Sequence, residues 1–103
     1  MTAPQIHGKG RIMFSHFEVA NVDIDSVRTI PGGPQMDEDF VKEGVKLLED
    51  NPEFDFPYII AVYDVLERCY WVIEGRHRSE SYRRAGTRRL TILVGRNMKI
   101  MDC

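Results

Sequence analysis

The chain has 103 residues, of which 43% are hydrophobic, enough for one compact domain with a single core but not for two. Its formal net charge of −2 gives no reason to expect a protein that coats nucleic acid or a membrane surface. The N-terminal sequence lacks an apolar stretch of signal-peptide length, and no apolar run approaches the ~20 residues that span a bilayer. These features predict a cytoplasmic protein with no membrane partner.

The first part of the chain contains a leader, a strand region and a loop. Residues 1–13 are rich in glycine and other small residues and predict a flexible leader, so the folded domain should span residues 14–103. Between residues 14 and 27, apolar residues alternate with polar ones, which predicts one strand or two short ones. Residues 28–35 read RTIPGGPQ, and their two prolines and two glycines predict a shaped loop.

The strongest helix signal lies between residues 36 and 51. Asp37 is the expected N-cap, and the acidic residues after it suit the positive end of a helix dipole. An apolar stripe repeats at helical spacing, and Asn51-Pro52 should end the helix. Gly44 is expected to be a weak point, because glycine inside a helix costs about 1 kcal/mol relative to alanine. The stripe consists of Phe40, Val41, Val45, Leu47 and Leu48.

The remaining elements complete an α/β pattern. Residues 58–65 and 69–73 are β-branched and aromatic and are separated by a short turn, which predicts two consecutive strands. A short helix should follow over residues 76–86, with Gly86 as its C-cap, and residues 90–94 should form a last strand. The order strand, loop, helix, strand, strand, helix, strand predicts a single α/β domain.

The cysteines and histidines give no sign of a metal site. Cys69 lies inside a strand-like segment and Cys103 is the last residue, so neither a disulfide framework nor a cysteine-based metal site is predicted. His7 and His16 lie outside any spacing typical of metal ligands.

The turn between the predicted strand and the second helix concentrates positive charge. Gly75 permits a tight turn, after which the helix begins at once with Arg76, His77 and Arg78. The unpaired N–H groups of a first helical turn and the positive end of its dipole form a ready anion site. Arginine can bind a phosphate through two parallel hydrogen bonds, and histidine can donate to one. Because three basic residues at a helix start destabilise it slightly, we predict that an oxyanion usually occupies this turn.

A simpler interpretation is that these arginines pair with nearby acids. Residues 37–55 carry eight acidic residues against two lysines, and residues 76–89 carry six arginines against one glutamate. The two blocks could fold against each other as solvated helix faces of opposite sign. Glu80, one helical turn after Arg76, could hold that side chain in a surface ion pair worth roughly 0.2–0.5 kcal/mol. In that case the turn would have no open anion site.

The same stretch resembles a known superfamily. The run IEGRHRSESYRRAG over residues 73–86, followed by the strand LTILV, is similar to the core of the ParB N-terminal domain and sulfiredoxin superfamily. The corresponding motif is Gly-Glu-Arg-Arg in ParB partition proteins and Gly-Cys-His-Arg in sulfiredoxins. The order of the other elements also agrees, so the resemblance covers about residues 19–96. It implies a ParB/sulfiredoxin-like fold, with a small mixed β-sheet and packed helices.

The resemblance also implies roles for individual residues. Gly75 matches the turn glycine, and His77 and Arg78 match the pair that contacts nucleotide phosphates. Arg28 takes the place of an arginine in the sulfiredoxin active site. Arg76 stands where sulfiredoxins have their nucleophilic cysteine, so sulfinic-acid reductase activity is not expected. The predicted phosphate or nucleotide site therefore consists of Arg28, Gly75, Arg76, His77 and Arg78.

Two classes of function follow from a bound nucleotide. The first is a nucleotide-dependent regulatory or NTPase-like module that binds a nucleoside di- or triphosphate, with magnesium accompanying a triphosphate. The second is a small phosphotransferase (kinase) of the same fold, which requires a carboxylate near the phosphate. The nearest candidates for a catalytic carboxylate are Glu74, Glu80 and Asp37.

A third class is a nucleic-acid-binding module of the partition type. Its basic track would extend from the turn into the second half of the basic block. The arginines of that track are Arg83, Arg84, Arg88 and Arg89. The sequence leaves enzymatic activity, a protein partner and a homodimer open.

Overall fold

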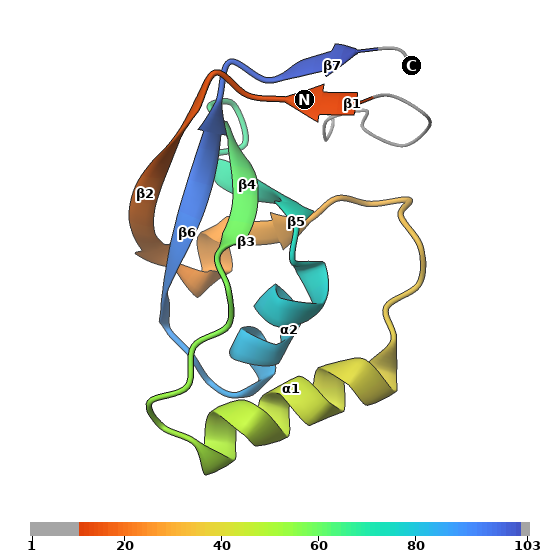
Figure 1. The fold of residues 1–103 in the computed structure, drawn as a ribbon, viewed down its shortest axis with the longest axis vertical. Helices are drawn as coiled ribbons and strands as arrows, with labels where there is room; N and C mark the ends of the chain where they lie inside the picture. The colour runs from red at the N-terminus through yellow and green to blue at the C-terminus, as the bar shows by residue number, and fades with distance from the viewer. Residues whose placement is uncertain (1–10, 102–103) are drawn as a thin grey trace.

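The computed structural model describes residues 11–101, which form a mixed five-stranded sheet with two helices packed against one of its faces (Figure 1). The strand order is β2-β6-β4-β5-β3. The outer strand β2 (His16–Asp23) is antiparallel to β6 (Arg89–Arg96), which runs parallel to β4 (Ile59–Asp64). β4 and β5 (Cys69–Glu74) form an antiparallel hairpin, and β5 pairs in parallel with β3 (Val27–Thr29). The predicted α/β class and the small mixed sheet are confirmed.

The N-terminal region differs in detail from the prediction. The strand region contains two strands, which a short 3-10 turn at Ile24–Ser26 separates, and β3 continues through Thr29 into the predicted loop. Within the predicted leader, Arg11–Met13 form β1, which pairs with β7 (Lys99–Met101) in a separate two-stranded sheet. Residues 1–10 and 102–103, which include His7 and Cys103, lie outside the described residues.

The helix α1 (Glu38–Asp50) begins and ends where the sequence predicts. The Asp37 carboxylate accepts a hydrogen bond from the Phe40 backbone N–H at 3.2 Å and so caps the helix. Its buried face, however, differs from the predicted stripe. Val41 is fully buried, whereas Phe40 and Leu47 are 58% and 43% exposed.

Gly44 lies where α1 crosses α2 (Arg76–Arg84). A Cβ atom at Gly44 would lie 2.3 Å from the Ser81 Oγ atom and 3.0 Å from the Ser81 Cβ atom. The Ser81 hydroxyl lies 2.9 Å from the His77 carbonyl oxygen of its own helix and 3.2 Å from the Val41 carbonyl oxygen of α1, so the two helices are in close contact at this point. Gly44 is therefore a close-contact position, and this packing offsets its weak helix propensity.

The sheet separates two apolar clusters. On one side, Tyr82 of α2 and Leu48 of α1 pack over strand residues that include Ile92. On the other side, Trp71 and the strands around it are partly covered by Phe14. Neither helix in residues 11–101 combines the length and hydropathy that a membrane crossing requires.

Candidate functional site

The turn from β5 into α2 has the geometry that the sequence predicts. Gly75 is the N-cap of α2 and has a φ of 97°. A Cβ atom at Gly75 would lie 3.1 Å from Ile59 Cγ1 and 3.2 Å from Arg78 Cζ, so the backbone angle and the lack of space both favour glycine. The first helical hydrogen bond runs from the Ser79 N–H to the Gly75 carbonyl at 2.9 Å. The N–H groups of residues 76–78 therefore have no helical acceptor.

Backbone carbonyls hold the two arginines of this turn. Arg78 Nη1 donates to the carbonyl oxygens of residues 57 and 58, at 3.1 and 3.2 Å. The guanidinium of Arg76 donates to the carbonyl oxygens of residues 34 and 35. Within residues 11–101 neither arginine forms an ion pair. A carbonyl oxygen fixes a guanidinium without cancelling its charge, so the simpler interpretation, neutralisation by acids, is wrong for these two residues.

His77 lies between the starts of the two helices. Its Nε2 atom accepts a hydrogen bond from the Asp37 backbone N–H at 3.1 Å, and the Phe40 ring meets it nearly at right angles, with ring centroids 5.4 Å apart. Because Nε2 accepts, the imidazole in this arrangement is neutral and carries its proton on Nδ1. The group that can donate to a phosphate oxygen is therefore Nδ1–H.

The three candidate carboxylates are placed differently. One oxygen of Asp37 caps α1, and Glu80 Oε2 accepts from Arg84 Nε at 2.8 Å, so Glu80 does not hold Arg76. Glu74 lines the hollow beside the turn. Of the three, Glu74 alone combines this position with a carboxylate that makes no hydrogen bond or ion pair within the described residues.

A hollow of about 480 Å³ lies against the turn, and we call it the corner hollow. Its volume is within the range of small-molecule sites, roughly 300–1,000 Å³. The apolar part of its lining comes from α1, β5 and the loop before β4, and its polar part from the turn itself. It is lined by Phe40, Phe56, Ile73, Glu74, Gly75, Arg76, His77 and Arg78.

Arg28 lies at the other end of β5. The β3–β5 register places it beside Trp71, and its Nη1 atom is 3.9 Å from Glu67 Oε2 in the β4–β5 turn. Glu67 precedes β5 and Gly75 follows it, so this contact directs the Arg28 guanidinium toward the start of β5, whereas the turn lies after its end. The lining of the corner hollow does not include Arg28, so its place in the phosphate site stays a prediction.

Most arginines further along the basic block are neutralised. Arg84 contacts Glu38 at 2.7 Å and Glu80 at 2.8 Å, and its hydrogen bond lowers the pKa of the Glu38 carboxyl. For Arg84 the interpretation that the acidic and basic blocks fold against each other is correct, whereas Arg83 and Arg89 pair with acids outside residues 37–55. The basic track needed for nucleic acid is thereby interrupted. The other ion pairs join Arg83 to Glu80 and Asp25, at 3.6 and 3.9 Å, and Arg89 to Asp23, at 3.1 Å.

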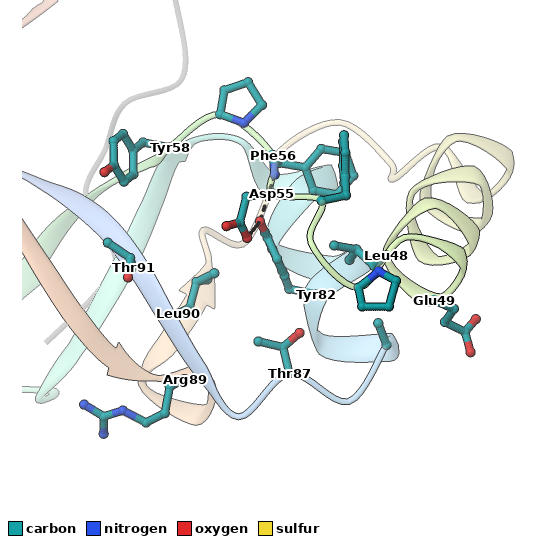
Figure 2. Close-up of a pocket in the computed structure, with 14 residues that line it drawn as sticks. Leu48, Glu49, Asp55, Phe56, Tyr58, Tyr82, Thr87, Arg89, Leu90 and Thr91 are labelled. Carbon is teal, nitrogen blue, oxygen red and sulfur yellow. Dashed lines mark hydrogen bonds between the residues drawn. The ribbon is translucent and has the colours of Figure 1, made fainter.

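A second hollow, which the sequence analysis missed, lies beside the end of α2 (Figure 2). It encloses about 530 Å³, and we call it the acidic groove. The Tyr82 hydroxyl donates to Asp55 Oδ1 at 3.3 Å and accepts from the Phe56 N–H at 2.9 Å, and burial raises the pKa of Tyr82. The sequence feature that could have indicated this groove is the run PEFDFPY at residues 52–58, in which two prolines flank aromatic and acidic residues. The groove is lined by residues 48–49, 52, 54–58, 82, 85, 87 and 89–91.

Among residues 11–101, no group of three or more histidine, cysteine, aspartate or glutamate side chains is arranged to hold a metal ion.

No protein-family model matches this chain, and no curated protein sequence matches it. Several solved structures do match it. The C-terminally truncated chromosome-partitioning protein ParB from Caulobacter crescentus, complexed with CTP-gamma-S, has a TM-score of 0.65 at 15% identity. The match covers 77% of this chain and 44% of ParB, so the chain spans less than half of that structure.

Two further structures are similar. Sulfiredoxin from Arabidopsis thaliana has a TM-score of 0.60 at 17% identity, over 78% of this chain and 86% of its own. A variant of a free serine kinase in complex with AMP has a TM-score of 0.62 at 12% identity, over 88% of this chain and 35% of its own. At such identities the likeness establishes the fold, and the predicted resemblance is confirmed at that level.

Proposed function

We propose, from the ParB/sulfiredoxin-like fold of this chain, that it binds a nucleotide by its phosphates in the corner hollow. The observation that carries the proposal is the uncompensated positive charge at the β5–α2 turn. Arg76 and Arg78 are held by carbonyl oxygens, whereas Arg83, Arg84 and Arg89 contact carboxylates. Positive charge without a counter-charge, beside the free N–H groups of a helix start, favours an oxyanion.

The residues of the turn would have different parts in binding. Gly75 would let phosphate oxygens approach the N–H groups of residues 76–78 closely. Arg78 uses only Nη1 in its bonds to the loop, and its Nε and Nη2 groups have no acceptor among the described residues, so they can donate to the phosphate. His77 would donate through Nδ1–H. Arg76, which uses both terminal nitrogens on residues 34 and 35, would position that loop and contribute charge.

The structural neighbours support a nucleotide as the source of the phosphate. The ParB structure contains CTP-gamma-S, the serine kinase structure contains AMP, and a second serine kinase structure that is similar to this chain contains ADP. These ligands differ in base and in phosphate number, so the proposal names nucleotides as a class and no particular base. Magnesium would accompany a triphosphate.

We favour a regulatory or NTPase-like module within this class. Each arginine of the turn anchors a loop, Arg76 through residues 34 and 35 and Arg78 through residues 57 and 58. A phosphate that competes for these guanidinium groups would change how firmly the two loops are held. Nucleotide binding would thereby alter the surface that a partner meets.

Phosphoryl transfer is the second candidate, because Glu74 lines the corner hollow and makes no ion pair within residues 11–101. It is the one predicted carboxylate that remains placed to act as a base on an attacking oxygen. Transfer of the terminal phosphoryl group of the bound nucleotide to an acceptor hydroxyl other than water, abolished by Glu74→Gln with binding retained, is the measurement that would establish this activity.

A thermal-shift panel of common nucleoside di- and triphosphates, with and without magnesium, tests nucleotide binding. A ligand that binds only the folded state raises Tm, and we expect at least one nucleotide to do so. Arg78→Gln should weaken its binding about tenfold to hundredfold, because a hydrogen bond to a charged group contributes about 1.5–3 kcal/mol. Titration calorimetry would give the affinities.

Arg88→Gln is the matched control. It also removes one arginine charge, but Arg88 follows the far end of α2, and its exposed side chain makes no contact with a carboxylate in the described part of the chain. Its nucleotide affinity should stay within about twofold of the unmodified protein. A panel in which no nucleotide raises Tm, or equal losses in the two variants, would contradict the proposal.

A further inference from the structure

The acidic groove is separate from the proposed nucleotide site. Of the residues that line the two hollows, Phe56 alone borders both. The groove combines apolar side chains, including Leu48 and Leu90, with the exposed carboxylate of Asp55. Figure 2 shows Asp55 beside the hydroxyl end of Tyr82, with Leu90 of β6 next to them.

The carboxylates of the groove have no counter-charge. Asp55 accepts one hydrogen bond, from the Tyr82 hydroxyl, and neither Asp55 nor Glu49 forms an ion pair within residues 11–101. Arg89 is the one cation in the lining, and its guanidinium is bound to Asp23 at 3.1 Å and points away from Asp55 in Figure 2. The hollow therefore presents negative charge above an apolar floor.

This pattern fits a particular kind of side chain. Lysine and arginine place a charged group at the tip of a long aliphatic stem, so they can cover apolar surface and reach a carboxylate at once. The surface next to the groove carries further exposed acids, Asp50 and Glu53. Nucleic acid and nucleotide phosphates would be repelled here, and a basic polypeptide would be attracted.

We propose that the acidic groove docks a lysine- or arginine-containing segment of a partner protein. The aliphatic stem would pack against Leu48, Leu90 and the ring of Tyr82, and the charged tip would meet the Asp55 carboxylate. Asp50 and Glu53 lie outside the lining and would add only weak, long-range attraction for the rest of a basic segment. The proposal does not depend on nucleotide binding in the corner hollow.

The test uses a fluorescein-labelled peptide of alternating lysine and serine residues, with binding followed by fluorescence anisotropy. Two double variants lose the same charge: Glu49→Gln/Asp55→Asn within the groove and Asp50→Asn/Glu53→Gln beside it. The amide oxygen introduced at position 55 can still accept from Tyr82, so the fold is retained. We expect the groove variant to bind about tenfold more weakly than the unmodified protein, and the control variant about twofold more weakly.

Chemical-shift mapping gives a second, independent readout. Addition of the lysine peptide should shift the backbone amides of Thr87, Leu90 and Thr91 and leave those of residues 76–78 unchanged. No binding of the peptide, or equal weakening in both double variants, would overturn the proposal. Binding of free cadaverine as tightly as the peptide would overturn it in favour of a small cation. Self-association that the groove variant loses, seen by sedimentation, would overturn it in favour of a second copy of this chain.

Discussion

The corner hollow and the acidic groove lie at opposite ends of α2 and differ in the sign of the charge they expose. At the start of the helix, carbonyl oxygens hold Arg76 and Arg78 and leave their charge uncancelled. At its end, Arg84 is neutralised by Glu38 and Glu80, and the exposed charge comes from the carboxylates of the groove. The contrast teaches that net charge within a segment is a poor guide to a site. The informative charges are those that the fold itself leaves without a partner.

The largest expected effect disturbs both hollows at once. Gly44→Ala would place a methyl group 2.3 Å from Ser81 Oγ, at the crossing of the two helices that border both hollows. We expect the free energy of unfolding to fall by about 2–3 kcal/mol, although alanine favours a helix by about 1 kcal/mol. Urea denaturation measures this change. Ser81→Ala in the same chain removes the closest contact and should restore part of the loss; a Gly44→Ala protein as stable as the unmodified one would show that the helices do not pack this closely.

A substitution at the turn should affect the corner hollow far more than the acidic groove. Gly75→Ala should lower the free energy of unfolding by about 2 kcal/mol, because its positive φ disfavours a side chain and the new methyl group would crowd Ile59 and Arg78. Gly86→Ala, at a φ of 86° with no atom within 4 Å, should lose only about 1 kcal/mol.

Ligand affinities distinguish the two glycine variants further. Gly75→Ala should lose nucleotide binding, because Arg78 is displaced, and should bind the lysine peptide only slightly more weakly, because Arg78 also holds the carbonyls of residues 57 and 58. Gly86→Ala should keep both. Equal nucleotide affinity in the two variants would mean that the Gly75 turn does not shape the corner hollow.

The smallest expected loss of stability comes from a substitution in the acidic groove. Tyr82→Phe removes the hydroxyl that accepts from the Phe56 N–H and donates to Asp55, so we expect a loss of about 1 kcal/mol of stability and faster hydrogen exchange at the Phe56 amide. Tyr63→Phe is the control, since the Tyr63 hydroxyl makes no hydrogen bond in the described part of the chain. Unchanged exchange at Phe56 in the Tyr82→Phe protein would show that this hydroxyl does not hold the loop.

Features that depend on neighbouring residues could be predicted from the sequence. The N-cap at Asp37 and the change from strand to helix at Gly75 are local, and both are found where the pattern indicated. The motif around Gly75 also led to the correct fold. Local patterns suffice here because capping, turn formation and helix polarity act within a few residues.

Features that depend on register and on distant segments could not be predicted. Arg28 is adjacent to the loop in sequence, but the pairing of β3 with β5 places its guanidinium near Glu67. Phe40 and Leu47 fit an apolar stripe, yet the packing of α1 on α2 buries the side that contains Gly44. The acidic groove is lined by residues from both helices, the loop before β4 and β6. The periodicity of a single segment cannot predict that such distant residues come together.

Residues 54–58 contact both ends of α2. Its carbonyls at residues 57 and 58 hold Arg78, while Asp55 and Phe56 are tied to Tyr82. An oxyanion that pulls Arg78 away from these carbonyls would loosen residues 54–58, which line the acidic groove. Because such coupling is reciprocal in equilibrium binding, a docked cation must change the oxyanion's affinity by the same factor. Through these five residues, the binding of an oxyanion at one end of α2 and of a cation at the other would each depend on whether the other ligand is present.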